Sequence, residues 1–295
     1  MYDPLTFHHE FTPEDFEAQY NLRTGRPDYE VTVIPDWQAR SETARAAMTC
    51  KSDIRYGTGE RQRLDVYACG DSGAPTLVYI HGGYWQRGDK SLYGFLAQPF
   101  VKAGVNVVVI GYDLCPAVTI TRISEEIREG MAYTWRNAAD LGVNRDRITV
   151  MGHSAGGHLT EMMMGTDWPA FGDDLPRNLV KAGIPVSPLS LLDPVRQTQG
   201  LNAAIRMDAA EAEAQSPMLH HPPLTDAPQM VVVGGAETEE FHRQAQMYVD
   251  AFATDARPVT LYVVPEVDHF DELNVLADPN SEFFARTIAM LREAA

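Results

Sequence analysis

The chain has 295 residues, of which 44% are hydrophobic, 22% charged and 9% aromatic, so it can bury a large core and shows no sign of disorder. Its formal net charge is −17, from 41 acidic and 24 basic side chains. Such a negative field argues against nucleic acid or an anionic membrane surface as the main partner. The three cysteines, Cys50, Cys69 and Cys115, have no metal-like spacing and fit a reducing compartment.

No segment has the pattern of a signal peptide or a membrane span. The first residues lack a basic start and a long apolar core, and the most apolar run, residues 105–110, is too short to cross a bilayer. We therefore expect a cytoplasmic protein that acts on a small molecule and has no membrane partner. A homodimer stays open, because the sequence does not show surface patches.

From residue 63 onward, short β-branched runs alternate with longer helical patterns. Strands are expected over residues 63–68, 76–80, 105–110, 147–151, 180–186, 229–233 and 259–264. Helices are expected over residues 90–102, 121–141, 155–165, 239–254 and 281–293. Several of the strand-like runs are apolar throughout, as in strands that are covered on both faces. The alternation predicts an α/β fold with a doubly wound, mostly parallel sheet.

Two regions depart from this alternation. Residues 1–50 contain polar helix-like segments separated by prolines, and we expect them to wrap around the sheet as an N-terminal extension. Residues 187–226 form a long insertion between two strands, and an insertion of this length often covers an active site like a lid. No linker-like segment follows Lys51, so residues 1–295 are expected to fold as a single domain.

The stretch Gly152-His153-Ser154-Ala155-Gly156 lies directly between a predicted strand and a predicted helix. This is the G-x-S-x-G nucleophile elbow in its required context. Glycines are needed there because side chains two residues from the serine would collide with neighbouring backbone. The motif predicts Ser154 as a nucleophile. The alternative is a glycine-rich turn with an incidental serine.

A serine hydroxyl needs a base to take its proton, and in this fold the partners follow in the order serine, acid, histidine. Of the nine histidines, this order favours His269, which lies in a loop after the last predicted strand. The acid should follow the preceding strand, which favours Glu237. Its rivals Glu239 and Glu240 suit the first turn of the next helix, where acidic side chains complement the helix dipole.

Acyl transfer places negative charge on a carbonyl oxygen, and backbone N–H groups aimed at that oxygen stabilise it. The expected donors are the amides of Ala155 and of Gly82 and Gly83, which follow a strand in the sequence HGGYW. A glycine turn that caps the strand is the alternative. His81 is expected to support this loop. Three further residues are candidates for the substrate pocket: Tyr84, Trp85 and His153, where the two aromatic rings could instead pack in the core.

Four of these motifs together resemble those of a known protein family. HGGYW (81–85), GHSAGGHL (152–159), GGAETEEFHRQ (234–244) and DHFDELNVLADPNSEF (268–283) resemble the arylformamidase (kynurenine formamidase)-like branch of the α/β-hydrolases, relatives of the hormone-sensitive-lipase type esterases. The resemblance extends from about Phe11 to Met290. It implies a hydrolase without metal or organic cofactor that uses Ser154, Glu237 and His269, and members of the branch cleave N-formyl-L-kynurenine to kynurenine and formate.

Two positions differ from the pattern of the branch. The acid is aspartate in some relatives and Glu237 here, which preserves the role. The relatives' Ser-Gly-x-x-Asp-Leu stretch is replaced by residues 187–194, SPLSLLDP, so the pocket wall near the insertion is expected to differ.

Two other functions stay open beside the aryl formamide hydrolase. A carboxylesterase of small acyl or aryl esters would use the same triad, and an inactive hydrolase fold could serve for binding. The sequence has no HExxH, CxxC or EF-hand pattern, and the pairs His153 with His158 and His220 with His221 lack support as metal ligands. No cofactor and no metal are expected.

Overall fold

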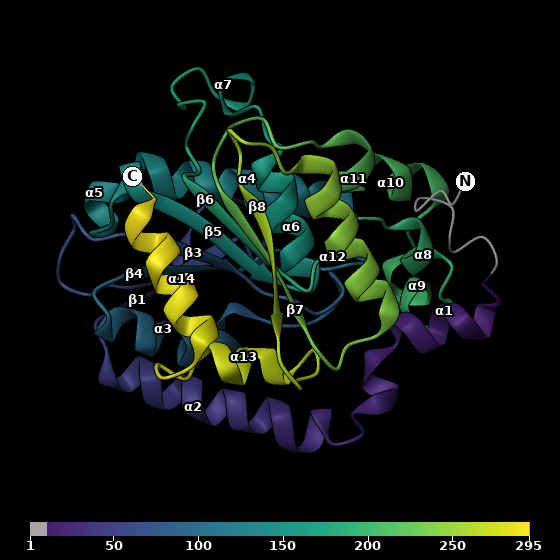
Figure 1. Ribbon diagram of the computed structural model, residues 1–295. Coiled ribbons are helices and arrows are strands. Elements are labelled where there is room, and N and C mark those ends of the chain that lie inside the picture. Colours follow the sequence, from purple (N-terminus) through teal and green to yellow (C-terminus); the bar gives the residue numbers. More distant parts are fainter. Residues whose placement is uncertain (1–10, 295) are drawn as a thin grey trace.

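The computed structural model describes residues 11–294, in which strands form one eight-stranded sheet in the order β1-β2-β4-β3-β5-β6-β7-β8 (Figure 1). Strand β2 runs antiparallel to both of its neighbours, and the strands from β4 to β8 are parallel. The strands are β1 (Cys50–Arg55), β2 (Arg63–Tyr67), β3 (Thr76–Ile80), β4 (Asn106–Ile110), β5 (Ile148–His153), β6 (Ala182–Val186), β7 (Gln229–Gly234) and β8 (Val259–Val264).

The central strands are buried on both faces, as their continuous apolar runs predict. In β3, Val78 and Ile80 join one core while Leu77 and Tyr79 join the other. All four side chains are 2% exposed or less. This alternation follows from the two-residue period of a strand, which directs successive side chains to opposite faces.

Helices cover both faces of the sheet (Figure 1). One face packs against α4 (Ile120–Arg136), α6 (Ala155–Met164) and α12 (Glu239–Phe252). The other packs against α2 (Ile34–Ala47), α3 (Gly94–Lys102), α13 (Asp271–Leu276) and α14 (Glu282–Glu293). The remaining short helices are α1 (Pro13–Tyr20), η2 (Leu22–Gly25), η3 (Tyr29–Val33), η4 (Lys90–Tyr93), α5 (Ala138–Leu141), η5 (Arg145–Arg147), α7 (Trp168–Phe171), α8 (Asp193–Arg196), α9 (Gln199–Ile205), α10 (Ala209–Ala214) and α11 (Pro217–His220). The doubly wound α/β prediction is confirmed.

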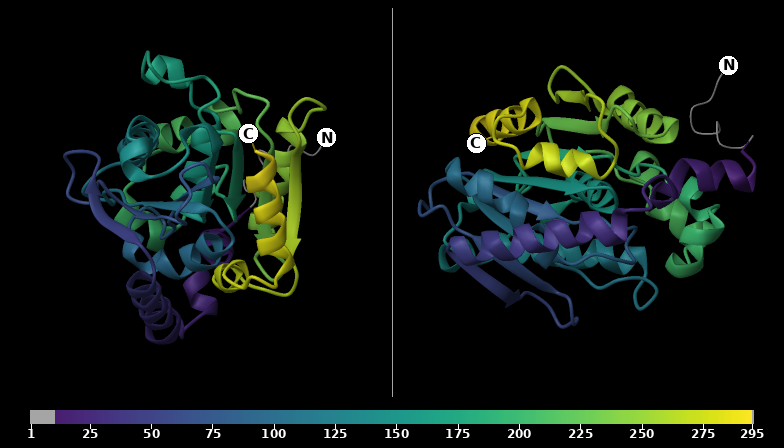
Figure 2. Two further views of the ribbon diagram at one scale, coloured as in Figure 1. Left: turned by 90° about the vertical axis from the view of Figure 1, so that its left-hand side faces the viewer. Right: turned by 90° about the horizontal axis from the view of Figure 1, so that it is seen from below.

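The first described residues form α1 and α2, and α2 lies outside α3 at the surface (Figure 2). Trp37, Ser41 and Ala44 form the buried stripe of α2, at the three- and four-residue spacing of one helix face. Trp37 stacks on Phe95 of α3, with ring centroids 5.7 Å apart. These contacts bring the N-terminal segment to the edge of the sheet where β3, β5, β7 and β8 end.

Several elements differ from the sequence prediction, among them α7 and α13, where no helix was expected. Strand β1 was not predicted, because CKSDIR has three charged side chains and an exposed edge position that leaves no apolar pattern. The predicted helix over 121–141 divides into α4 and α5 at Asn137, whose side chain donates to the carbonyl of Tyr133. No helix of residues 11–294 is long and apolar enough to cross a membrane.

Candidate active site

The turn between β5 and α6 holds Ser154 in a conformation that few residues adopt. Its φ is 59° and its ψ is −120°, in the left-handed half of backbone space. The flanking glycines are required by space. A Cβ on Gly152 would lie 2.2 Å from the carbonyl oxygen of Gly156, and a Cβ on Gly156 would lie 2.1 Å from that of Ile80. The strand, elbow and helix thus lie as the motif predicts.

His269 and Glu237 are brought together from two loops at the same edge of the sheet. Nδ1 of His269 lies 2.6 Å from Oε2 of Glu237, and both side chains are almost completely buried. Because an ionised carboxylate accepts only, the imidazole carries its hydrogen on Nδ1 and leaves Nε2 as a base. Oε1 of Glu237 accepts from the amide of Gly234 at 3.0 Å.

The rival acids do not pair with His269. Glu239 and Glu240 lie in the first turn of α12, and Glu240 accepts from the hydroxyl of Tyr20 at 2.5 Å and pairs with Arg243. Asp268 pairs with Arg26 instead of His269, at 2.5 Å. The nearest carboxylate to His269 is therefore that of Glu237.

Ser154 and His269 line the same pocket, together with Gly82 and Gly83. Among residues 11–294, no acceptor pairs with the amides of Gly82, Gly83 or Ala155, so these three donors are free to bind an oxygen. A Cβ on Gly82 would lie 2.7 Å from the carbonyl oxygen of His153, and Gly83 has a φ of 120°. Both positions therefore exclude a side chain.

His81 supports this loop from behind, as the sequence suggests. Its Nδ1 donates to the carbonyl oxygen of Gly82 at 2.8 Å, and its ring stacks on Tyr112 with centroids 4.3 Å apart. Burial lowers the pKa of His81 to about 4, so the imidazole is neutral at physiological pH.

The three candidate pocket residues have different environments. Tyr84 lines the pocket and donates its hydroxyl to the carbonyl oxygen of Tyr20 at 2.5 Å. His153 also lines it, and its Nε2 donates to the backbone oxygen of His269 at 2.8 Å. Burial, with the neighbouring His269, lowers the pKa of His153 well below its ordinary value.

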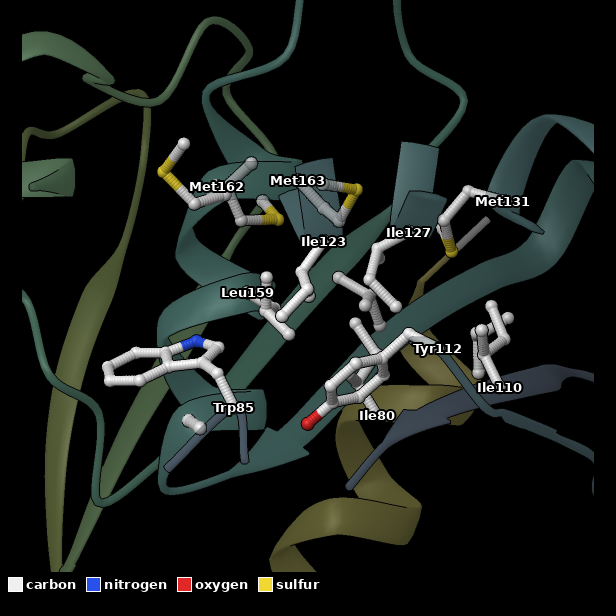
Figure 3. Packing of buried hydrophobic residues seen from close by; sticks show 14 of the residues in the cluster. Ile80, Trp85, Ile110, Tyr112, Ile123, Ile127, Met131, Leu159, Met162 and Met163 are labelled. Carbon is white, nitrogen blue, oxygen red and sulfur yellow. The ribbon is translucent and has the colours of Figure 1, made fainter. Parts of the chain in front are cut away.

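The expectation of pocket contact is wrong for Trp85. Its side chain is fully buried, and Figure 3 shows its ring beside Leu159 in the hydrophobic core. The indole N–H donates to Nδ1 of His158 at 3.2 Å. Tyr84 and Trp85 both have positive φ, 50° and 55°, so the turn directs one ring toward the pocket and the next into the core.

The pocket walls come largely from parts of the chain without catalytic motifs. Tyr29 and Trp37 from the N-terminal segment, with Tyr84, Tyr93 and Phe270, make it aromatic. Two guanidinium groups, those of Arg23 and Arg87, also line the pocket. Of these wall residues only Tyr84 was predicted, because aromatic and basic side chains outside a catalytic motif give no signal of a pocket.

Two further buried residues lie behind the triad candidates and were not predicted. Ser187, at the end of β6, bonds to Glu237, and it also lies 2.7 Å from Glu272 of α13. Glu272 lies in the first turn of α13, which begins at Asp271, and no sequence motif pointed to it. Ligand atoms of His153, His269 and Glu272 lie within 4.8 Å of one another. Because hydrogen bonds already engage all three side chains, we describe them as a hydrogen-bond network.

Comparison with known proteins shows which family the chain belongs to. The chain is 31% identical to a kynurenine formamidase of Danio rerio over 278 residues, which cover 90% of this chain and 92% of that protein. The chain belongs to the arylformamidase (kynurenine formamidase)-like family of α/β-hydrolases. It is therefore a hydrolase. A family model described as BD-FAE matches residues 64–177 of this family member, the part that contains the elbow and the HGG loop.

Solved structures share the fold of this arylformamidase-like protein. A protein from Silicibacter sp. TM1040, provisionally described as a thioesterase, is 32% identical with a TM-score of 0.73, and the match covers 89% of this chain and 93% of that one. Esterase B from Lactobacillus rhamnosis, crystallised with an inhibitor, is 18% identical with a TM-score of 0.68, covering 89% and 96%. The α/β-hydrolase fold is thus confirmed.

Proposed function

We propose that this protein is a serine hydrolase that cleaves an aryl formamide such as N-formyl-L-kynurenine and gives kynurenine and formate. The observation that carries the proposal is the pocket itself. It brings Ser154, the Glu237-paired His269 and the free glycine amides to one aromatic cavity. Residues 187–226 add Gly200 and Leu201 to its rim, which supports a covering role for the insertion within a single-domain enzyme.

The first half of the reaction forms an acyl-enzyme. Nε2 of His269 takes the proton of Ser154 as its Oγ attacks the formyl carbon. The negative charge on the carbonyl oxygen is stabilised by the amides of Gly82, Gly83 and Ala155. His269 then gives the proton to the departing aryl nitrogen, the C–N bond breaks, and a formyl ester remains on Ser154.

The second half returns the enzyme to its starting state. A water molecule gives a proton to His269 and attacks the same carbon, and the amides again stabilise the oxyanion. The bond to Ser154 breaks, Oγ recovers its proton from His269, and formate leaves. Glu237 stays ionised throughout and stabilises the imidazolium that forms twice in each turnover.

The walls of the pocket favour a substrate with an aryl ring and a carboxylate. The aromatic side chains can pack on a ring. Arg23 and Arg87 both contact the carboxylate of Glu30, at 2.8 Å and 3.5 Å, so two guanidinium groups share one acid and retain donors for an anion. An N-formyl aryl amino acid has both features.

A carboxylesterase of small acyl or aryl esters is the second candidate. The likeness to esterase B concerns the fold, and the same nucleophile and oxyanion donors would accept an ester carbonyl. The two candidates differ in the leaving group, because an amine needs protonation by His269 before it departs and a phenolate does not.

Labelling with a fluorophosphonate probe tests the shared mechanism. The wild-type protein should gain one covalent adduct on Ser154, and Ser154→Ala should neither label nor turn over substrate while its thermal unfolding is unchanged. Ser72→Ala, at an exposed loop position, serves as the matched control. A labelled or active Ser154→Ala variant would overturn the assignment.

A further inference from the structure

Two buried carboxyl groups meet at one hydroxyl behind His269. Oγ of Ser187 is hydrogen-bonded to Oε1 of Glu237 and lies 2.7 Å from Oε2 of Glu272. Ser187 and Glu272 are fully buried, and the Glu237 side chain is unexposed. The three residues come from the ends of β6 and β7 and from α13, so the contact is made only by the folded chain.

Counting hydrogens shows that one of the two acids is protonated. A serine hydroxyl has a single hydrogen and can donate to one carboxylate only. The second contact joins two oxygens at hydrogen-bonding distance, which requires a hydrogen on the other carboxyl group. The chain therefore contains one carboxylate and one carboxylic acid.

The neighbours decide which of the two carries the proton. Glu237 receives the Nδ1–H of His269 and the amide of Gly234, so its charged form is stabilised from two sides. Glu272 has no such support, and no lysine or arginine of residues 11–294 pairs with it. Nε2 of His153 is 3.6 Å away and already donates to the backbone of His269.

The remaining groups around Glu272 also oppose a charge on it. The titratable or charged groups that face it from the packed elements are Tyr79, His153, Glu237, Asp268 and His269. The nearby guanidinium, that of Arg26, is engaged with Asp268 at 2.5 Å. Burial, followed by the charge of Glu237, raises the pKa of Glu272 well above its ordinary value.

We propose that Glu272 is a positioning residue that stays protonated, donates to Ser187 and, through it, holds Glu237 as a fixed charged acceptor for His269. The hydrogen-bond chain runs from Glu272 to Ser187 to Glu237, with His269 donating from the other side. This role rests on the proposed function of the triad. It adds a neutral acid and a hydroxyl to the residues that set the orientation and basicity of His269.

The pH dependence of kcat/KM separates a neutral Glu272 from a charged one. Glu272→Gln keeps the shape and a donor but cannot ionise. If Glu272 is neutral, the acid limb of the profile, which reports His269, stays at the wild-type pH and kcat falls less than about 5-fold. If Glu272 is charged, the substitution removes a negative charge beside His269 and shifts that limb down by about 1 unit or more. The downward shift would overturn the proposal.

Removal of the hydrogen-bond donor at residue 272 should lower activity much more than replacement of the carboxyl group by an amide that still donates. Glu272→Leu and Ser187→Ala should each lower kcat about 10- to 100-fold with little change in KM, because Glu237 loses its fixed orientation. Rescue by Glu272→Gln is the expected contrast with Glu272→Leu. Glu282→Gln, which removes an exposed acid paired with Arg286, is the matched control. Equal activity of the Gln and Leu variants would contradict the donor role.

An infrared measurement makes the test independent of substrate and of the variants' activity. The difference spectrum of wild type minus Glu272→Gln at neutral pH should contain the C=O stretch of a carboxylic acid. A carboxylate band in its place would overturn the proposal, and a Gln variant that does not fold can be replaced by comparing wild type at neutral and alkaline pH. The kinetic measurements use N-formylkynurenine or 4-nitrophenyl acetate, whichever the wild-type protein hydrolyses. Failure of the formamidase assignment is therefore distinguishable from failure of the role proposed for Glu272.

Discussion

At the scale of single residues, Arg23 is one of two arginines that line the pocket. Its guanidinium lines the pocket, lies 4.6 Å from the ring centroid of Tyr29, and keeps most of its surface buried. A charge-assisted hydrogen bond to a substrate carboxylate would contribute about 1.5–3 kcal/mol.

Arg23→Gln should therefore raise KM for N-formylkynurenine about 10-fold while kcat changes less than 2-fold. KM for N-formylaniline, which has no carboxylate, should be unchanged in the same steady-state assays. Arg136→Gln, at a surface pair with Asp174, is the control. An equal rise in KM for both formamides would show that Arg23 acts through pocket shape and not through charge.

The residues that could be predicted from the sequence are those fixed by neighbours along the chain. Ser154, Gly82 and Gly83 are constrained by local geometry, since each turn admits only certain residues. Glu272 and Ser187 could not be predicted, because they are 85 positions apart and their shared hydrogen bond exists only after folding. Tyr84 and Trp85 were ambiguous for the same reason, since the sequence does not show which way a strained turn points.

At the scale of elements, the loop that holds His269 is tied to the N-terminal segment by Arg26. Its guanidinium lies 2.5 Å from Asp268 and 3.0 Å from Asp271, on either side of the histidine loop, and also pairs with Asp28. The group is 20% exposed, so solvent screens the pairs only in part.

Arg26→Gln should lower kcat/KM about 10-fold, because a loosened loop misplaces the imidazole, while the melting temperature falls by only a few degrees. Steady-state kinetics and a thermal melt of the same preparation measure both quantities. Arg286→Gln, which breaks an exposed pair with Glu282, should change neither. Unchanged kcat/KM would mean that α13 alone positions the loop.

Helix α6 is anchored to the insertion by His158. Its Nδ1 accepts from Trp85, and its Nε2 donates to the carbonyl oxygen of Gln215 at 2.8 Å, so the buried ring is neutral. Burial lowers the pKa of His158 to about 3, against 6.5 in an unfolded chain. Below pH 6.5 the unfolded state therefore binds a proton that the folded state does not. The free energy of unfolding decreases as the pH is lowered from 6.5.

His158→Gln should be less stable than wild type by about 1–3 kcal/mol at pH 7.5, because a buried hydrogen bond is lost. The difference should shrink by about 1.4 kcal/mol for each pH unit below 6.5, since only the wild-type unfolded chain gains that proton. Urea unfolding of both proteins at pH 7.5, 6.0 and 5.0 measures this difference in the free energy of unfolding. A pH-independent difference would contradict the neutral buried imidazole.

Most elements followed from the sequence because apolar runs and helical periods have clear patterns. Strands β3 and β8 have the predicted bounds, and the five helices that were predicted after residue 90 begin within a few residues of their predicted positions, whereas α7 and α13 were not predicted. Strand β1 was not predicted, because an edge strand with polar side chains is held by backbone pairing with β2, and backbone pairing gives no pattern of apolar residues in the sequence.

At the scale of the whole molecule, the N-terminal segment completes the pocket that the sheet begins. The sheet edge supplies Ser154, the glycine amides and His269, whereas Tyr29, Trp37 and other wall residues come from a segment that is distant in sequence. The wrapping of this segment was predicted, but its contribution to the pocket was not, because its placement depends on packing of α2 against α3. The proposed catalytic groups and much of the pocket wall thus come from different parts of the chain.

The central claim is most directly tested by comparing kcat/KM for N-formyl-L-kynurenine and for 4-nitrophenyl acetate with one preparation of the wild-type protein. In the proposed mechanism both reactions use Ser154, so their ratio reports how well the aromatic and basic walls fit the leaving group. We predict that kcat/KM for N-formylkynurenine is the larger by about 10-fold or more, although the ester is the more reactive substrate. A preference for the ester, with little or no deformylation, would contradict the formamidase assignment and favour the carboxylesterase.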